Sequence, residues 1–194
     1  MTDPRSQRHA LTKRRILDEA WALAARDGVA AVSLGDLAKR VGLRQPSLYT
    51  YFASKNDLYD ELFSDGNRQL LATVAAQDYP EDPRDALKAF ARAVVGFCAA
   101  DVARYHLLFQ RHVPTFQPSP ESYALAQDFV TWARPLLARA GIERDEDFDV
   151  FTALIAGLAD QQVANDPGGT RYLALTDQVM DMLLDRLARQ PFAR

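Results

Sequence analysis

The sequence predicts an all-α fold of about nine helices, with an N-terminal three-helix headpiece followed by a larger helical body. Leu, Ala, Arg and Asp are abundant along the 194 residues, and apolar residues recur at helical spacing. Stretches rich in Val, Ile and Thr that alternate with polar residues, which would indicate strands, are absent. Gly and Pro separate the helical stretches from one another.

Four helices are expected in the first part of the chain. Asp27-Gly28 ends the first helix, and Gly42 separates the second from the third. Ser33 and Ser54 are each followed three residues later by Asp, an arrangement similar to a capping box. The expected helices are Thr12–Arg26, Ser33–Val41, Gln45–Phe52 and Lys55 to about Ala76.

Five further helices are expected after Pro80 and Pro83, which close the fourth. Three prolines make Val113–Pro120 a predicted loop, and Asp166–Gly169 is a predicted turn. Pro135 is expected to kink the helix that contains it. The five helices are Pro83–Ala100, Val102–Arg111, Glu121–Ala140, Glu146–Asn165 and Thr170–Gln190.

Charge is distributed unevenly along the chain. Residues 1–55 contain 10 Lys and Arg against 5 Asp and Glu, a net charge of +5. The remaining residues contain 13 and 21, a net charge of −8, which gives −3 for the whole chain. A basic head on an acidic body is expected where only one end meets phosphates, although charge alone leaves chance clustering equally open.

Composition and motifs argue against several classes of protein. No stretch resembles a membrane-spanning helix, the N-terminus lacks the apolar core of a secretory signal, and Cys98 is the single cysteine, so a cytoplasmic location is expected. Phosphate-binding, hydrolase and zinc-protease motifs are absent. His106 and His112 are expected on different helix faces, and His9 in a mobile tail. We therefore expect no enzyme activity, metal or cofactor.

Residues 32–55 have the layout of a helix-turn-helix, whose second helix enters the major groove of DNA. Gly42 can adopt a positive φ in the turn, and Ala38 is small enough for close helix crossing. A plain helical hairpin is the alternative, but it would not present polar residues on one exposed face. The predicted mini-core is Leu34, Leu37, Val41, Leu43, Leu48 and Phe52.

The outward side chains of the third helix are mostly hydrogen-bond formers. Gln45 suits adenine and Arg44 suits guanine, because each can pair bidentately with a base edge. Tyr49 and Lys55 suit phosphates, and Lys55 lies at a helix N-terminus. The expected DNA-binding residues are Ser33, Arg44, Gln45, Pro46, Ser47, Tyr49, Thr50, Tyr51 and Lys55.

Over about residues 12–62 the sequence resembles the TetR family, named for the tetracycline repressor. Two features depart from the family pattern. Leu43-Arg44 stands where many members have Val-Ser, and Gly35 lies inside a helix, where Gly costs about 1 kcal/mol relative to Ala. The matching residues are Gly28, Ser33, Ala38, Gly42, Leu48, Tyr49, Phe52, Lys55 and Leu58, with the run Gln45–Tyr49.

The resemblance implies a DNA-binding domain over residues 1–54 and a ligand-binding and dimerisation domain over residues 55–194. It implies a homodimer that binds a palindromic double-stranded DNA operator, usually as a repressor, and that a small-molecule effector releases. The fourth helix runs from Lys55 to Leu70 and Leu71, so it is expected to link DNA to the effector. A helical-bundle enzyme or small-molecule carrier is the alternative, but it leaves the basic head unexplained.

Eight of the 19 aromatic residues lie between Phe90 and Trp132, and small-molecule pockets are mostly apolar and aromatic. Ordinary bundle core is the alternative interpretation of each ring. No cluster of like charges lies in this segment, so a largely apolar effector is expected, with His106 and Gln110 as further polar candidates. The expected ligand-binding residues are Phe97, Tyr105, Phe109, Phe129, Trp132 and Gln162.

The last two long helices are expected to form the dimer interface, since two from each subunit make a four-helix bundle. Both carry more apolar surface than one core-facing stripe needs, and Ala156-Gly157 permits close approach of a partner helix. A monomer that ends in a helical hairpin is the alternative. The expected interface residues are Phe151, Thr152, Ile155, Leu158, Ala159, Leu175, Val179, Met182 and Leu183.

Overall fold

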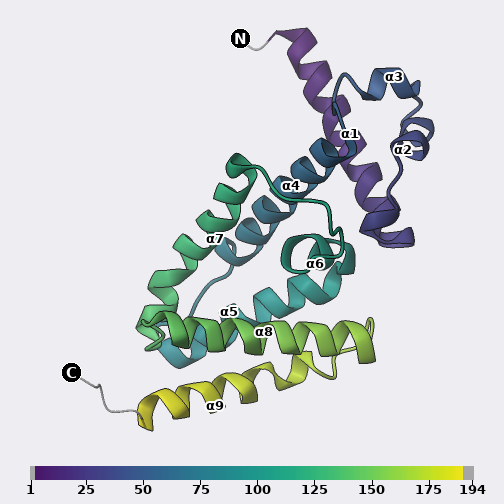
Figure 1. The fold of residues 1–194 in the computed structure, drawn as a ribbon. Coiled ribbons are helices and arrows are strands. Elements are labelled where there is room, and N and C mark those ends of the chain that lie inside the picture. The colour runs from purple at the N-terminus through teal and green to yellow at the C-terminus, as the bar shows by residue number, and fades with distance from the viewer. Residues whose placement is uncertain (1–2, 190–194) are drawn as a thin grey trace. The chain divides into compact units, whose positions relative to one another are not determined.

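The computed structural model describes residues 3–189, which form nine α-helices and two short 3-10 helices without a strand (Figure 1). The predicted all-α class and helix count are confirmed. No helix within the described range is long and apolar enough to span a membrane. The elements are α1 (Pro4–Asp27), η1 (Val29–Ala31), α2 (Leu34–Arg40), α3 (Gln45–Leu48), α4 (Lys55–Ala75), α5 (Pro83–Ala100), α6 (Val102–Phe109), α7 (Pro120–Arg139), α8 (Asp145–Asn165), η2 (Leu173–Leu175) and α9 (Thr176–Arg189).

The first helix is two turns longer than predicted. The Asp3 side chain accepts a hydrogen bond from the backbone N–H of Arg5 (3.1 Å), and Pro4 occupies the first turn, where its missing N–H costs nothing. The helix therefore begins at Pro4 instead of Thr12. The expectation that His9 lies in a mobile tail was wrong, because His9 belongs to α1.

The third helix is shorter than predicted and ends at Leu48. No side chain caps its start at Arg44, as the sequence indicated. At its end the Thr50 hydroxyl donates to the carbonyl of Ser47 (2.7 Å), which satisfies a helix-end acceptor and favours a turn. Between α2 and α3, Gly42 has a φ of 71°, the left-handed conformation expected of this glycine.

The last helix begins at Thr176, six residues later than predicted. The side-chain oxygen of Gln162 accepts hydrogen bonds from the backbone N–H groups of Tyr172 (2.9 Å) and Leu173 (3.1 Å). These bonds hold the preceding segment in a turn and a 3-10 helix. The predicted end of this helix at Gln190 lies outside the described residues.

The chain divides into two compact units. The first comprises Met1–Asn67 and Ala103–Leu125, and the second comprises Arg68–Val102 and Ala126–Arg194. The divisions fall inside α4, after Val102 at the start of α6, and inside α7, so the helix-turn-helix belongs to the same unit as the rest of α6. The boundary between residues 54 and 55 concerns function and stays a prediction.

The core of the first unit joins α1, α4 and α6. The indole of Trp21 donates to the Asp65 carboxylate (2.8 Å), and the Arg104 guanidinium lies 4.5 Å from the centre of that ring system. A Cβ on Gly66 would lie 3.0 Å from a methyl carbon of Leu108, so α4 and α6 approach closely because residue 66 lacks a side chain. Of the predicted mini-core, Leu43 is half-buried, and the buried members are Leu34, Leu37, Val41, Leu48 and Phe52.

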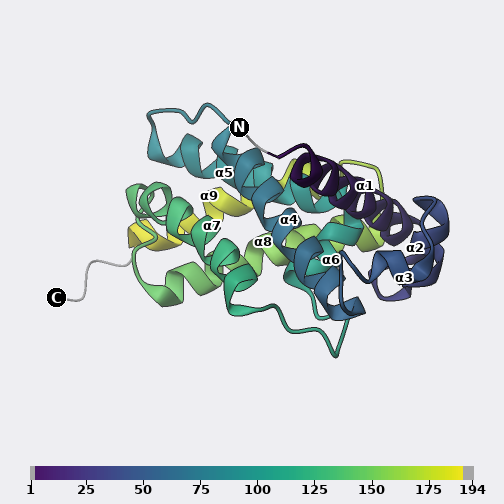
Figure 2. The same cartoon turned by 90° about the horizontal axis from the view of Figure 1, so that it is seen from above.

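The core of the second unit is built where α5 packs against α8 and α9 (Figures 1 and 2). Phe90 of α5 is 1% exposed, and its ring centre lies 6.1 Å from those of Phe129 and Phe151. At the start of α8 the buried Asp147 accepts hydrogen bonds from Arg144 (2.8 Å) and from Arg186 of α9 (3.0 Å). The bond from Arg144 and that from Arg186 outweigh burial and lower the pKa of Asp147.

Candidate nucleic-acid interface

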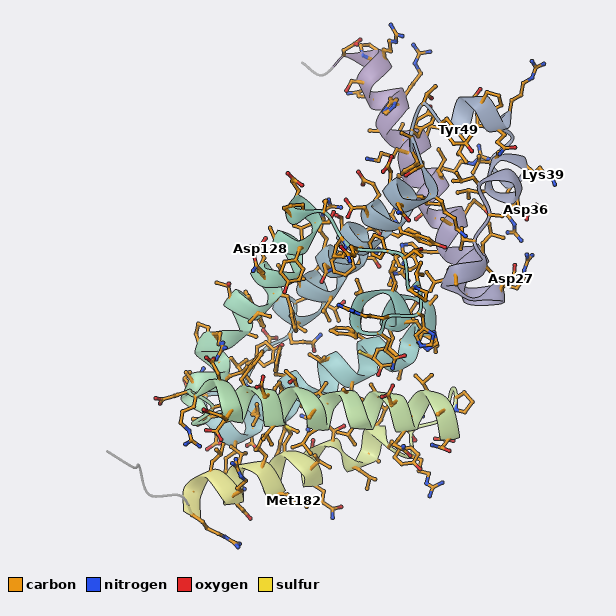
Figure 3. All side chains as sticks on the ribbon, viewed as in Figure 1. Asp27, Asp36, Lys39, Tyr49, Asp128 and Met182 are labelled. Carbon is orange, nitrogen blue, oxygen red and sulfur yellow. The ribbon has the colours of Figure 1, made fainter. Side chains whose placement is uncertain are left out.

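The residues around α3 place a polar set of side chains on the surface of the first unit. Arg44, Gln45, Pro46, Tyr49 and Thr50 are exposed, and Tyr49 is 46% exposed despite its large ring. On the opposite side of α3, the buried Leu48 anchors the helix to the mini-core. Figure 3 labels Tyr49 on the same helix-turn-helix as Lys39 and Asp36 of α2. The arrangement gives a short helix with one anchored side and one open side.

Two of the expected DNA-binding residues also stabilise the motif. The Ser33 hydroxyl accepts a hydrogen bond from the backbone N–H of Asp36 (3.4 Å) and caps α2, as the sequence predicted. Ser47 is half-buried, and its carbonyl accepts the bond from Thr50. Substitution of Ser33 would therefore change the stability of the headpiece as well as any DNA contact.

Tyr51 is held against the first helix. Its half-buried ring stacks on the imidazole of His9, with ring centres 4.6 Å apart and ring planes 21° apart. This contact brings the start of α1 beside the segment that follows α3. No local sequence pattern pairs residues so far apart, which is why the motif alone did not include His9.

Lys55 starts α4 and has internal partners. Its ammonium donates to the carbonyl of Ala30 (3.0 Å) and lies 5.3 Å from the ring centre of Tyr59. The Ser54 hydroxyl accepts from the backbone N–H of Asp57 (3.1 Å), so the predicted cap is present. The side chain of Lys55 is exposed, and its ammonium has three N–H donors, so a phosphate can be bound while the bond to Ala30 is kept.

A hydrogen-bonded cluster attaches the start of α7 to α4. The Asp60 carboxylate accepts from the N–H (2.7 Å) and hydroxyl (2.8 Å) of Ser119 and from the hydroxyl of Ser122 (2.6 Å). Burial acts to raise the pKa of Asp60, but the bonds from Ser122 and Ser119 outweigh it, so this pKa lies below its ordinary value. The loop before α7 is thereby fixed on the helix that starts at Lys55.

The expected ligand-binding residues are divided between the two units. In the first unit Tyr105 is buried and Phe109 is 47% exposed, with ring centres 6.0 Å apart. In the second unit the ring centre of Trp132 lies 6.1 Å from that of Phe90, and Phe97 is half-buried. Burial raises the pKa of the neighbouring Tyr79 to about 12, so this phenol is neutral at ordinary pH.

Gln162, the polar member of that expected set, is used inside the fold. Its amide nitrogen donates to the carbonyls of Asp166 and Gly169, and its oxygen accepts from Tyr172 and Leu173. The side chain is 1% exposed. We therefore assign Gln162 to the α8–α9 turn and do not include it in the ligand site proposed below.

His106 and His112 do not lie on different helix faces as expected. α6 ends at Phe109, and the chain turns so that the two imidazoles stack with centres 3.9 Å apart. The expectation assumed a helix extending to Arg111. Among residues 3–189, no group of three or more His, Cys, Asp and Glu is arranged to hold a metal ion.

The expected dimer residues of α8 and α9 divide by burial. Thr152 is exposed, Leu175 is 40% and Met182 is 65% exposed, and Val179 is half-buried. Ala156-Gly157 is exposed too, and Figure 3 labels Met182 on the surface of α9. The members buried within the chain itself are Phe151, Ile155, Leu158, Ala159 and Leu183.

Comparison with known proteins finds similarity that includes the helix-turn-helix. The model described as bacterial regulatory proteins, tetR family, matches residues 16–62. The HTH-type transcriptional regulator AcrR of Shigella flexneri is 34% identical over 79 residues, which are 40% of this chain and 37% of AcrR. The HTH-type transcriptional repressor Rv1353c of Mycobacterium tuberculosis is 28% identical over 152 residues, which are 77% of this chain and 56% of the repressor.

The chain spans between about a third and just over half of the length of these curated relatives. A solved structure extends the likeness of fold beyond the headpiece. The multidrug binding protein EbrR, crystallised with imidazole, matches with a TM-score of 0.63 at 22% identity, covering 94% of this chain and 97% of EbrR. At this identity the match shows a shared fold alone.

Proposed function

We propose, on the premise that this chain belongs to the TetR family of DNA-binding transcriptional regulators, that it represses transcription from a palindromic operator until a small, largely apolar effector releases it. The related mycobacterial repressor supports the sign of the regulation, and the multidrug binding protein of the same fold supports the effector class. Members of the family are regulators and not enzymes. The proposed site of action is the cytoplasm, where the operator lies.

The open side of α3 is the observation that carries the proposal. Leu48 and Phe52 fix the segment to the core while Arg44, Gln45 and Tyr49 stay exposed. A helix anchored on one side and polar on the other can enter the major groove without losing its packing. A buried hairpin would have covered these side chains. We retain residues 1–54 as the proposed DNA-binding domain.

The proposed roles of Gln45 and Lys55 predict two kinds of defect. Gln45→Ala should relax specificity at one base position by about 1–3 kcal/mol, because alanine cannot pair with a base edge. Lys55→Ala should weaken binding to all sequences alike and flatten the salt dependence, because alanine cannot pair with a phosphate. Binding to a set of operator variants separates the two, and an equal change of preferred sequence in both variants would contradict the assignment. Since Lys55 also bonds to Ala30, unfolding of the variant is measured in parallel.

A dimer is proposed to form through the exposed faces of α8 and α9. Met182 and Leu175 expose large apolar side chains, and the small residues of Ala156-Gly157 permit close helix approach. Met182→Glu should therefore shift the protein towards monomer and weaken operator binding. Light scattering at micromolar concentration measures this, and a monomeric wild type would refute the proposed dimer.

The effector is proposed to act through α4, which begins at Lys55 and crosses from the first compact unit to the second. Within the first unit α6 contacts both α4 and α1, since Leu108 packs on Gly66 and Arg104 lies over the ring of Trp21. A ligand beside Tyr105 and Phe109 would shift α6 and, through these contacts, α4 and α1. Within the second unit, taken by itself, the expected ligand contacts Phe97, Phe129 and Trp132 stay a proposal.

Thermodynamic linkage between effector binding and operator binding provides a test of this proposed release. A coupling that lowers operator affinity 5- to 150-fold requires operator DNA to weaken effector binding by the same factor. Calorimetric titration of the effector, with and without operator, measures that factor, and equal affinities would refute the switch. The two tryptophans report two separate events. Trp132→Phe should remove the fluorescence response of a ligand bound beside Trp132, and Trp21→Phe should remove the response to movement of Arg104, which lies over the Trp21 ring.

A further inference from the structure

The start of α1 carries a group of cations outside the helix-turn-helix. Residues 4–17 contain five Lys and Arg and no Asp or Glu. Two of these cations are neutralised inside the first unit, because Lys13 pairs with Glu61 and Arg14 pairs with Asp65. The other three are exposed and form no ion pair with any described residue: Arg5, Arg8 and Arg15.

These three arginines share one side of the helix. Intervals of three and seven residues place Arg5, Arg8 and Arg15 in one stripe along α1, which extends over about 15 Å at a rise of about 1.5 Å per residue. The neighbouring face carries His9, whose ring stacks on Tyr51. The stack therefore sets the stripe beside the segment that follows α3, at the end of the unit where α1 begins (Figure 1).

We propose that Arg5, Arg8 and Arg15 form a second phosphate-binding edge next to α3, which His9 and Tyr51 hold in position. The inference rests on the proposed function, because the partner is the backbone of double-stranded DNA that flanks the bases read by α3. Guanidinium groups suit phosphate oxygens, and cations that form no ion pair can bind phosphates without breaking one, although Arg8 also donates a hydrogen bond to the carbonyl of Pro4 (3.4 Å). Such contacts add affinity for any sequence and release counterions from the DNA.

Salt dependence tests the edge directly. The variant Arg5→Gln/Arg8→Gln/Arg15→Gln is compared with Arg68→Gln/Arg111→Gln/Arg189→Gln, which removes three other exposed arginines and changes the net charge equally. In the first variant only, the plot of log affinity against log salt should become less steep. The magnitude of its slope should fall by about 0.9 for each phosphate that is no longer neutralised, hence by up to about 2.7 per subunit. The preferred operator sequence should not change.

The outcomes separate this inference from the proposed function. A wild type that binds no DNA would overturn both. The second edge alone would be overturned if the wild type binds an operator but the first triple variant keeps the wild-type salt slope. The same holds if the first triple variant behaves like the control triple variant. Circular dichroism of both triple variants checks that α1 stays helical.

The role of His9 has a separate test, because His9 is a positioning residue and touches no phosphate in this proposal. His9→Ala removes the stacked ring and should lower operator affinity and the salt slope together. His9→Phe restores a ring that can stack on Tyr51 and should return both values towards those of the wild type. Equal values for wild type and His9→Ala would show that the stack does not hold the edge.

Discussion

α3 and the α8–α9 pair were both predicted to be contact surfaces, but their expected contact residues differ in how far they are buried. Six of the nine expected DNA-binding residues are exposed, whereas five of the nine expected dimer residues are buried within the chain. A helix of four residues needs only an anchor such as Leu48, so its polar side chains stay available. Long helices in a bundle bury wide apolar stripes, so an apolar residue such as Phe151 does not by itself mark an interface.

The largest expected effect on stability comes from a substitution in the buried core of the second unit. Phe90→Ala removes a ring that contacts Phe129, Phe151 and Trp132 and should lower the free energy of unfolding by about 3–5 kcal/mol. Chemical denaturation measures this decrease. A change below about 1 kcal/mol would mean that the second unit does not depend on this aromatic core.

The turn between α8 and α9 gives the next effect. Gln162→Ala leaves two backbone N–H groups, of Tyr172 and Leu173, without their acceptor and should cost about 1–3 kcal/mol of unfolding free energy. Gln161→Ala, an exposed neighbour, is the control. If Gln162→Ala instead keeps full stability and abolishes effector binding, Gln162 belongs to the ligand site, as the sequence pattern predicted.

Sequence reasoning succeeded where signals are local. The caps at Ser33 and Ser54, the turn at Gly42 and the open face around Gln45 all follow from neighbours in the chain. It failed where distant side chains decide the structure. The stacking of His9 on Tyr51 and the use of Gln162 in a turn depend on tertiary contacts that no periodicity reveals.

The pH dependence of stability can be compared between one carboxylate of each unit. Asp60 and Asp147 have lowered pKa values, so each stabilises the fold above the unfolded-state pKa of about 4, and this contribution disappears as pH falls through the folded pKa. The stability difference between wild type and Asp147→Asn should therefore be largest above about pH 5 and narrow below about pH 4. Asp60→Asn should behave alike, with Asp128→Asn as the exposed control. A difference that stays constant with pH would contradict the account.

The smallest expected effect on stability belongs to the open side of α3. Tyr49→Ala should change the free energy of unfolding by less than about 0.5 kcal/mol, because nearly half of the side chain is exposed. The same variant should weaken operator binding. Denaturation and gel shift on one preparation measure both, and a large decrease in stability would show that Tyr49 is a structural residue.

Selection of binding sites from a random DNA pool tests the central claim, that the helix beginning at Gln45 reads an operator, most directly. The wild type should enrich an inverted repeat with half-sites about 34–36 Å apart or somewhat more, and Gln45→Ala should lose preference at one position in each half-site. Failure of the wild type to enrich any sequence, or an identical motif from Gln45→Ala, would contradict the claim.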